Sequence, residues 1–198
     1  MNLLFSTQSW RRVEMISLGL IVSCAVAGGV GNTSSRAQRT ERTLESEIPK
    51  HVPIQIRFRA NKEAAFKKFD NEHWVNDLEF EIKNTGNKPI YCFEFAIELP
   101  DVTPGADRHP TFGLHYGRPE LLSFEAALTP DDLPIKPGDT VTISVDANDI
   151  KAWEHFRKAG EWQLPKTIIL LFVRMNFGDG TGLDGGDARP WPEAKRPF

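Results

Sequence analysis

Cysteine is scarce in this chain: only Cys24 and Cys92 occur among 198 residues. Cys24 lies in an N-terminal segment that we expect to be removed or lipidated, so the mature domain would hold one thiol and no disulfide. Cys92 stands in the middle of a predicted strand, where a small buried packing role is more typical than a reactive thiol. The domain must therefore be stabilised by its apolar core, and 13 Phe and 5 Trp residues can supply one.

An excess of basic charge is also missing. The sequence has 24 Lys and Arg residues against 27 Asp and Glu residues, which gives a formal net charge of −3 at pH 7. This balance produces no broad positive field that would attract nucleic acid or anionic lipid. We expect no nucleic-acid partner, and contact with a membrane only if the chain carries a lipid anchor.

An apolar run of bilayer-spanning length is missing as well. The run over residues 15–30 has 16 residues, whereas a transmembrane helix needs about 20. An arginine pair precedes this run and small residues end it, which is the pattern of an export signal. Two processing sites stay open: cleavage after the small residues 25–27 would release a secreted protein, whereas residues 21–24 resemble the bacterial lipobox, in which Cys24 is lipidated. We predict an exported protein, either a periplasmic, cell-surface or outer-membrane lipoprotein or a freely secreted chain.

Composition divides the sequence into four parts. Residues 1–31 form the signal, and residues 32–51 are polar, mixed in charge and typical of a flexible tether. Residues 52–187 carry the alternating apolar pattern of a β-sandwich domain. Residues 188–198 contain three prolines and are expected to be an unstructured tail.

The domain is organised around two strands, over residues 78–83 and 90–99. Large apolar residues alternate with polar or small ones along both, which is the period of a half-buried strand. A polar turn over residues 84–89 joins them. The turn could close a hairpin or carry the chain from one sheet to the other, so the pairing of the two strands stays open.

Further elements follow from the same reasoning. Residues 146–160 should form a helix, because Asp146 or Asn148 can cap its start and Gly160 can end it. Residues 167–177 are apolar on both faces, which predicts a central strand that is covered on both sides. The remaining predicted elements are a short helix over residues 61–69 and strands over residues 52–58, 111–116, 121–124 and 140–145.

Two turns carry a resemblance to a known architecture. Asn84-Thr85-Gly86-Asn87 ends the first central strand, and Pro137-Gly138-Asp139 opens the strand at residues 140–145. This arrangement resembles bacterial immunoglobulin-like β-sandwich domains of secreted proteins or lipoproteins. The resemblance implies a mainly β, antiparallel sandwich, to which this chain adds one short helix at about 147–160 between late strands. It also implies an adhesion, spacer or ligand-binding role that is usually non-catalytic.

Residues 180–185 form a literal G-x-G-x-x-G motif. A dinucleotide site needs a helix directly after the glycines, but only 13 residues remain and prolines interrupt them. Three neighbouring aspartates, Asp179, Asp184 and Asp187, are weak candidates for Ca²⁺ ligands, although their spacing does not match an EF-hand loop. We therefore expect no cofactor, with Ca²⁺ left open as an alternative.

No pattern of catalytic residues stands out. The five histidines are scattered, and no G-x-S-x-G nucleophile motif occurs. We predict a non-catalytic binding module for an unknown protein or carbohydrate ligand. The leading contact candidates are the aromatic residues Trp74, Tyr116, Trp162 and Trp191. The alternative is a small secreted hydrolase or accessory enzyme that uses carboxylates on the loops around residues 101–134.

Overall fold

The structure is a computed structural model, and it describes residues 41–103 and 109–193. The predicted signal, Cys24, residues 32–40 of the predicted tether and the last residues of the tail lie outside the described residues. The described residues are mainly β, and their strands form two sheets.

The larger sheet has the strand order β5-β4-β7-β8-β9, and β1 pairs with β7 away from this path. All neighbours are antiparallel except β1, which runs parallel to the first residues of β7. Because β4 occupies one edge of β7, β1 and β8 share the other edge, one after the other along the strand. The strands are β1 (Thr43–Ser46), β4 (Cys92–Glu98), β5 (Thr111–Tyr116), β7 (Thr167–Asn176), β8 (Gly182–Asp184) and β9 (Arg189–Trp191).

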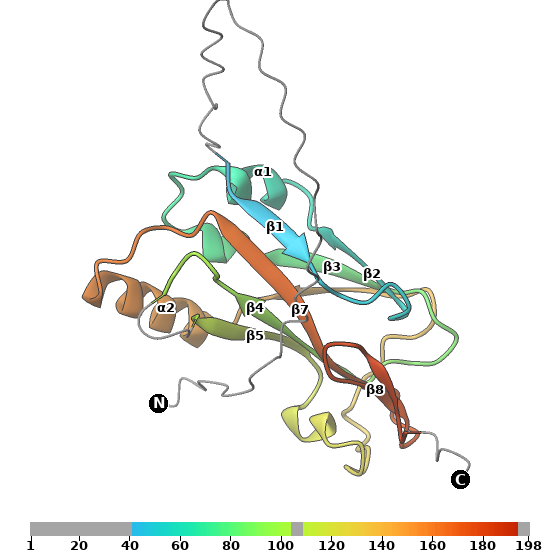
Figure 1. Ribbon diagram of the computed structural model, residues 1–198. Coiled ribbons are helices and arrows are strands. Elements are labelled where there is room, and N and C mark those ends of the chain that lie inside the picture. The colour runs from blue at the N-terminus through green and yellow to red at the C-terminus, as the bar shows by residue number, and fades with distance from the viewer. Residues whose placement is uncertain (1–40, 104–108, 194–198) are drawn as a thin grey trace, which may run out of the picture. The chain divides into compact units, whose positions relative to one another are not determined.

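The smaller sheet is antiparallel and has the order β2-β3-β6. Its strands are β2 (Ile54–Phe58), β3 (Glu79–Asn84) and β6 (Thr140–Ser144). Side chains from both sheets meet in one apolar core, and Figure 1 shows the two sheets as layers with the long helix α2 at one side. The predicted β-sandwich with a short helix is therefore confirmed, whereas its membership of the immunoglobulin-like class stays a prediction.

The helices connect strands. The α-helices are α1 (Lys62–Lys67) and α2 (Ala147–Ala159), and the 3-10 helices are η1 (Trp74–Asp77) and η2 (Pro119–Leu122). The backbone N–H of Asn148 donates to the Asp146 carboxylate at 2.7 Å, so Asp146 is the N-cap of α2. Trp153 on α2 is buried in the core, so one face of the helix packs on the sandwich. Neither α-helix in the described part of the chain is long and apolar enough to cross a bilayer.

The two central strands belong to different sheets, which resolves their pairing. β3 lies in the smaller sheet and β4 in the larger one, so the turn between them is a crossover and not a hairpin. Buried Asn84 shapes this turn: its amide nitrogen donates to the carbonyls of Lys88 and Ile135, each at 2.8 Å, and its amide oxygen accepts from the N–H of Gly86 at 2.9 Å. A short polar side chain that bonds its own following backbone favours a turn over continued strand.

The inward residues of β3 and β4 form the middle of the core. Phe80 and Ile82 face inward from β3, and Phe93, Phe95 and Ile97 face inward from β4, all of them almost fully buried. Full burial of one such side chain contributes about 1.5–3 kcal/mol relative to exposure. A slip of one residue in either strand would expose this set, so the alternation fixes the register.

The structure differs from the predicted domain limits at both ends of the domain. Within the predicted tether, residues 43–46 form β1 and Arg42 is fully buried. Within the predicted tail, residues 189–191 form β9. Both strands are short edge strands without a visible apolar period, so their formation depends on the neighbouring strand and not on local sequence.

Two further predictions were wrong. Residues 121–124 do not form a strand, because η2 begins at Pro119, a residue suited to the first turn of a helix. The strand over residues 167–177 is central, but it is not equally covered on both faces. Ile168, Leu170 and Phe172 are buried, whereas Ile169, Leu171 and Val173 are only partly buried.

Candidate functional site

Three exposed apolar side chains lie on two segments that meet at Phe124. Among the described residues, three large hydrophobic side chains count as exposed: Leu128 at 37 %, Leu133 at 72 % and Trp191 at 39 %. The two leucines lie on the connection that follows η2, and Trp191 lies on β9. We call these three residues, together with Phe124, the loop-end surface; in Figure 1 the connection that follows η2 is yellow and β8 is red.

Phe124 links the two segments of this surface. Its ring is stacked on the indole of Trp191, with centroids 5.2 Å apart and planes at 15°. The Phe124 ring also contacts the guanidinium of Arg174, which lies 5.1 Å from the ring centroid. Gly182 on β8 lies against the Phe124 ring, where a Cβ atom would clash with it. The glycine therefore allows the loop to approach the sheet.

Polar contacts fix the same loop to β7. Arg174 donates from Nε to Asp184 at 2.6 Å and from Nη1 to the carbonyl of Leu122 at 2.5 Å. Buried Asn176 donates to the carbonyl of Leu121 at 2.7 Å. Because side chains of a central strand bond the backbone of the loop, the loop-end surface is held on a rigid support.

A bidentate ion pair between Arg118 and Asp132 holds the two ends of the rest of the loop together. Arg118 donates to both carboxylate oxygens of Asp132, at 3.0 and 2.9 Å, and Asp132 also accepts from the N–H and hydroxyl of Thr129. These bonds to the charged form, from Arg118 first, hold the pKa of Asp132 well below its ordinary value. Asp132 is therefore a structural carboxylate at neutral pH.

The three candidate Ca²⁺ ligands are not brought together. Asp179 accepts from Lys88 at 2.8 Å, Asp184 from Arg174, and Asp187 from Arg189 at 3.0 Å. Bonds from Lys88 and Thr181 lower the pKa of Asp179 to about 2. Each carboxylate thus has its own cation, and no group of three metal ligands occurs in residues 41–103 and 109–193.

Two of the loop carboxylates of the hydrolase alternative, Asp101 and Asp132, have structural partners. Asp101 accepts the backbone N–H groups of Lys166 and Thr167, at 2.9 and 2.6 Å, and so holds the start of β7. Asp132 accepts hydrogen bonds from Arg118 and from the backbone N–H of Thr129. Asp107 lies outside the described residues. General acid–base catalysis needs carboxylates that face a shared substrate position, and these two hold backbone instead.

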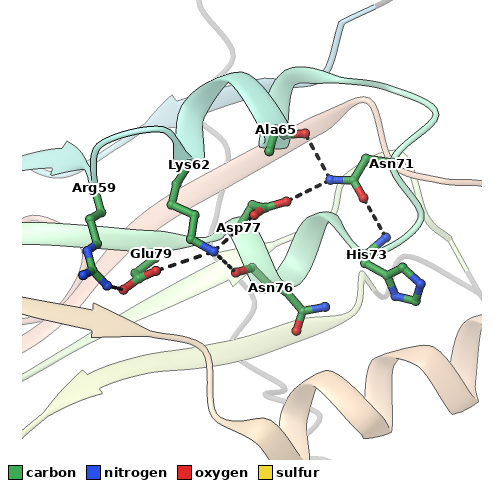
Figure 2. A network of polar contacts seen from close by, with 8 residues as sticks. All are labelled: Arg59, Lys62, Ala65, Asn71, His73, Asn76, Asp77 and Glu79. Carbon is green, nitrogen blue, oxygen red and sulfur yellow. Dashed lines mark hydrogen bonds and ion pairs between the residues drawn. The ribbon is translucent and has the colours of Figure 1, made fainter.

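A polar network joins α1, η1 and β3 on another part of the surface (Figure 2). Lys62 donates to the backbone carbonyl of Asn76 at 3.2 Å and lies 3.3 Å from Asp77 and 3.6 Å from Glu79. Asn71 donates to Asp77 at 2.9 Å. A hydrogen bond from the Arg59 guanidinium lowers the pKa of Glu79. Charges alternate through the network and are satisfied within it, so the network supports α1.

The aromatic candidates separate into core and surface. Trp74 is fully buried, Tyr116 is stacked on Phe93, and Trp162 is stacked on Phe156. Only Trp191 contributes to the loop-end surface. The sequence analysis missed Phe124, Leu128 and Leu133; the available signal was apolar residues in a proline-rich connection that has no apolar period.

Cys92 has the environment expected from its position. The side chain is buried at 1 % exposure, and burial raises the pKa of the thiol to about 12. The reactive thiolate is therefore not populated at neutral pH.

The loop-end surface offers apolar and aromatic area on a rigid support, and Arg118, Asp132 and Arg174 beside it are paired. Comparison with known proteins adds no relative: no protein-family model, no curated protein and no solved structure matches this chain.

Proposed function

We propose that this chain is an exported, non-catalytic immunoglobulin-like binding module that contacts a protein or carbohydrate ligand through the loop-end surface. The observation that carries the proposal is the stack of Trp191 on Phe124, with Leu128 and Leu133 exposed on the same loop. Tryptophan is enriched among the residues that dominate binding energy, because its ring supplies much contact area for little lost conformational entropy.

Two further observations support this role. The loop is bonded to β7 through Arg174 and Asn176, so its apolar groups need little ordering when a ligand binds. The export part is supported by the sequence of residues 15–30. The crossover turn at Asn84 supports the immunoglobulin-like class, since it carries the chain between sheets.

The binding proposal is tested with arrays of immobilised glycans and of cell-envelope proteins. The wild-type chain, W191A and L133S are compared with K158A, an exposed residue of α2 that serves as a matched control. We expect a retained ligand whose Kd rises about 30-fold in W191A, which corresponds to about 2 kcal/mol for a central aromatic contact. Equal binding by W191A, or hydrolytic turnover by the purified chain with no retained ligand, would contradict the proposal.

The export proposal has a separate measurement. Mass spectrometry of the mature N-terminus distinguishes a lipidated Cys24 from a chain that begins after Ala27. An intact N-terminus in the native host would contradict export.

A further inference from the structure

The outer face of the larger sheet carries an apolar strip. Along β7, Ile168, Leu170 and Phe172 point into the core, so Ile169 and Leu171 point to the opposite side. Val173 is the extra residue where the register between β4 and β7 shifts, and it is partly exposed like the other two. None of the three packs against the core.

Strand register shows what lies beside this strip. Ala96 of β4 is adjacent to Leu171, and Gly113 of β5 is adjacent to Ala96. These two residues add only a methyl group and a hydrogen atom to the face, so the β7 side chains stand above their neighbours on that side. The carboxylate of Glu94 leans over the same place, 3.6 Å from where a Cβ atom at Gly113 would be.

Glutamates surround the strip. Glu98 of β4 and Glu45 of β1 are both adjacent to Ile169 in register, on its two sides. Glu94 is adjacent to Arg174, but Arg174 bonds Asp184 and the carbonyl of Leu122. No described side chain forms an ion pair with any of these three glutamates.

The smaller sheet provides a comparison within the same molecule. On its outer face Glu81 is paired with Arg57 at 2.7 Å, and Glu79 is paired with Arg59. The outward glutamates of that sheet are thus neutralised by arginines on β2 or directly after it. The larger sheet instead combines an apolar strip with unpaired negative charge, and this combination is complementary to a positively charged, amphipathic partner.

We propose that the outer face of the larger sheet binds a basic amphipathic helix of a partner protein. Backbone groups in the middle of a sheet are already paired, so an incoming segment meets only side chains there, and a helix can offer side chains along one stripe. Its apolar stripe would cover Ile169, Leu171 and Val173, and its Lys or Arg residues would approach Glu45, Glu94 and Glu98. This face is separate from the loop-end surface, so neither proposal depends on the other.

The test uses the full chain and a fluorescent helical peptide of leucine and lysine, with the lysines on one side. A peptide in which glutamate replaces lysine has the opposite charge and serves as its partner control. The triple variant E45Q/E94Q/E98Q is compared with D139N/E161Q/E193Q, which removes the same charge from exposed positions elsewhere. L171S tests the apolar strip, and circular dichroism confirms that each variant is folded.

We expect the lysine peptide to bind at neutral pH and the glutamate peptide not to bind. The face variant should raise the Kd about 10-fold, the charge-matched control should leave it unchanged, and added salt should weaken binding. Equal binding of both peptides, equal loss in both triple variants, or no binding by wild type would overturn the proposal. Binding to vesicles of anionic lipid in place of the peptide would overturn it too. If L171S does not fold, the comparison of the two triple variants still decides the result.

Discussion

Replacing Arg42 by methionine should destabilise the domain more than any surface substitution, because Arg42 is a fully buried cation that is bonded only to backbone. Its Nε donates to the carbonyl of Pro165 at 3.1 Å, and Nη1 donates to those of Phe66 at 2.7 Å and Lys68 at 3.1 Å. Nη2 donates to two further carbonyls, at positions 69 and 71. The guanidinium also lies 5.0 Å from the Trp74 ring centroid.

The expected magnitude follows from these contacts. Burial lowers the pKa of Arg42 to about 10, so the side chain remains charged at neutral pH. A hydrogen bond from a charged donor contributes about 1.5–3 kcal/mol, but five such bonds are not additive because water can reach some of the freed carbonyls. We expect Arg42→Met to cost about 3–5 kcal/mol of unfolding free energy, because it leaves several buried carbonyls without a donor at about 1–3 kcal/mol each. For a domain of this size that corresponds to a fall in Tm of about 6–20 °C.

Urea and thermal unfolding followed by circular dichroism measure this loss. Arg59→Met is the matched control, since Arg59 is 55 % exposed and pairs with a single carboxylate; it should cost less than about 1 kcal/mol. Arg42→Lys should fall between the two, because an ammonium has three donors for the five carbonyls. A cost for Arg42→Met within about 1 kcal/mol of the Arg59→Met value would refute the reasoning.

Three further outcomes follow from the described contacts. In a Cys24→Ser background, Cys92 should react with a thiol reagent only at the rate of unfolding, and fast reaction of the folded chain would show that the thiol is accessible. Gly182→Ala should displace the Phe124 ring and lower stability by about 1–3 kcal/mol, seen as a shift in tryptophan fluorescence and in Tm. Asp132→Asn should be destabilising at neutral pH and lose its effect in acid. The folded-state pKa of Asp132 lies below the unfolded value, so its contribution is present above about pH 4 and disappears as the carboxylate protonates; a difference from wild type that stays constant down to about pH 2 would contradict this assignment.

Alternation of apolar residues predicted most of the sandwich. The central strands, the strand at residues 111–116, β6 and β7 all have strict alternation or a long apolar run, and the Asp146 cap marked the start of α2. These signals are local, and the structure keeps them because a slip would expose several large side chains.

The missing parts depend on distant residues. β1 has four residues and no period, and it forms because β7 offers a free edge. The burial of Arg42 requires carbonyls from the end of α1 and from the residues that follow it, as well as from Pro165. The loop-end surface depends on the register of β8 and β9, which places Trp191 beside Gly182 and beneath Phe124. The sequence around any one of these residues does not contain that information.

The late position of β7 has a consequence for how the chain is made. Arg42 bonds Pro165, 123 residues further on, and β4 has β7 as its neighbour on one edge. Until residues up to 176 have left the ribosome, the apolar strand β4 lacks that neighbour. For the same reason β1 cannot pair with β7. Contacts between such distant residues slow folding and leave strand edges open to association. Productive folding of this domain therefore waits until β7 has been made, and a chain that stalls after α2 would be a substrate for chaperones or proteases.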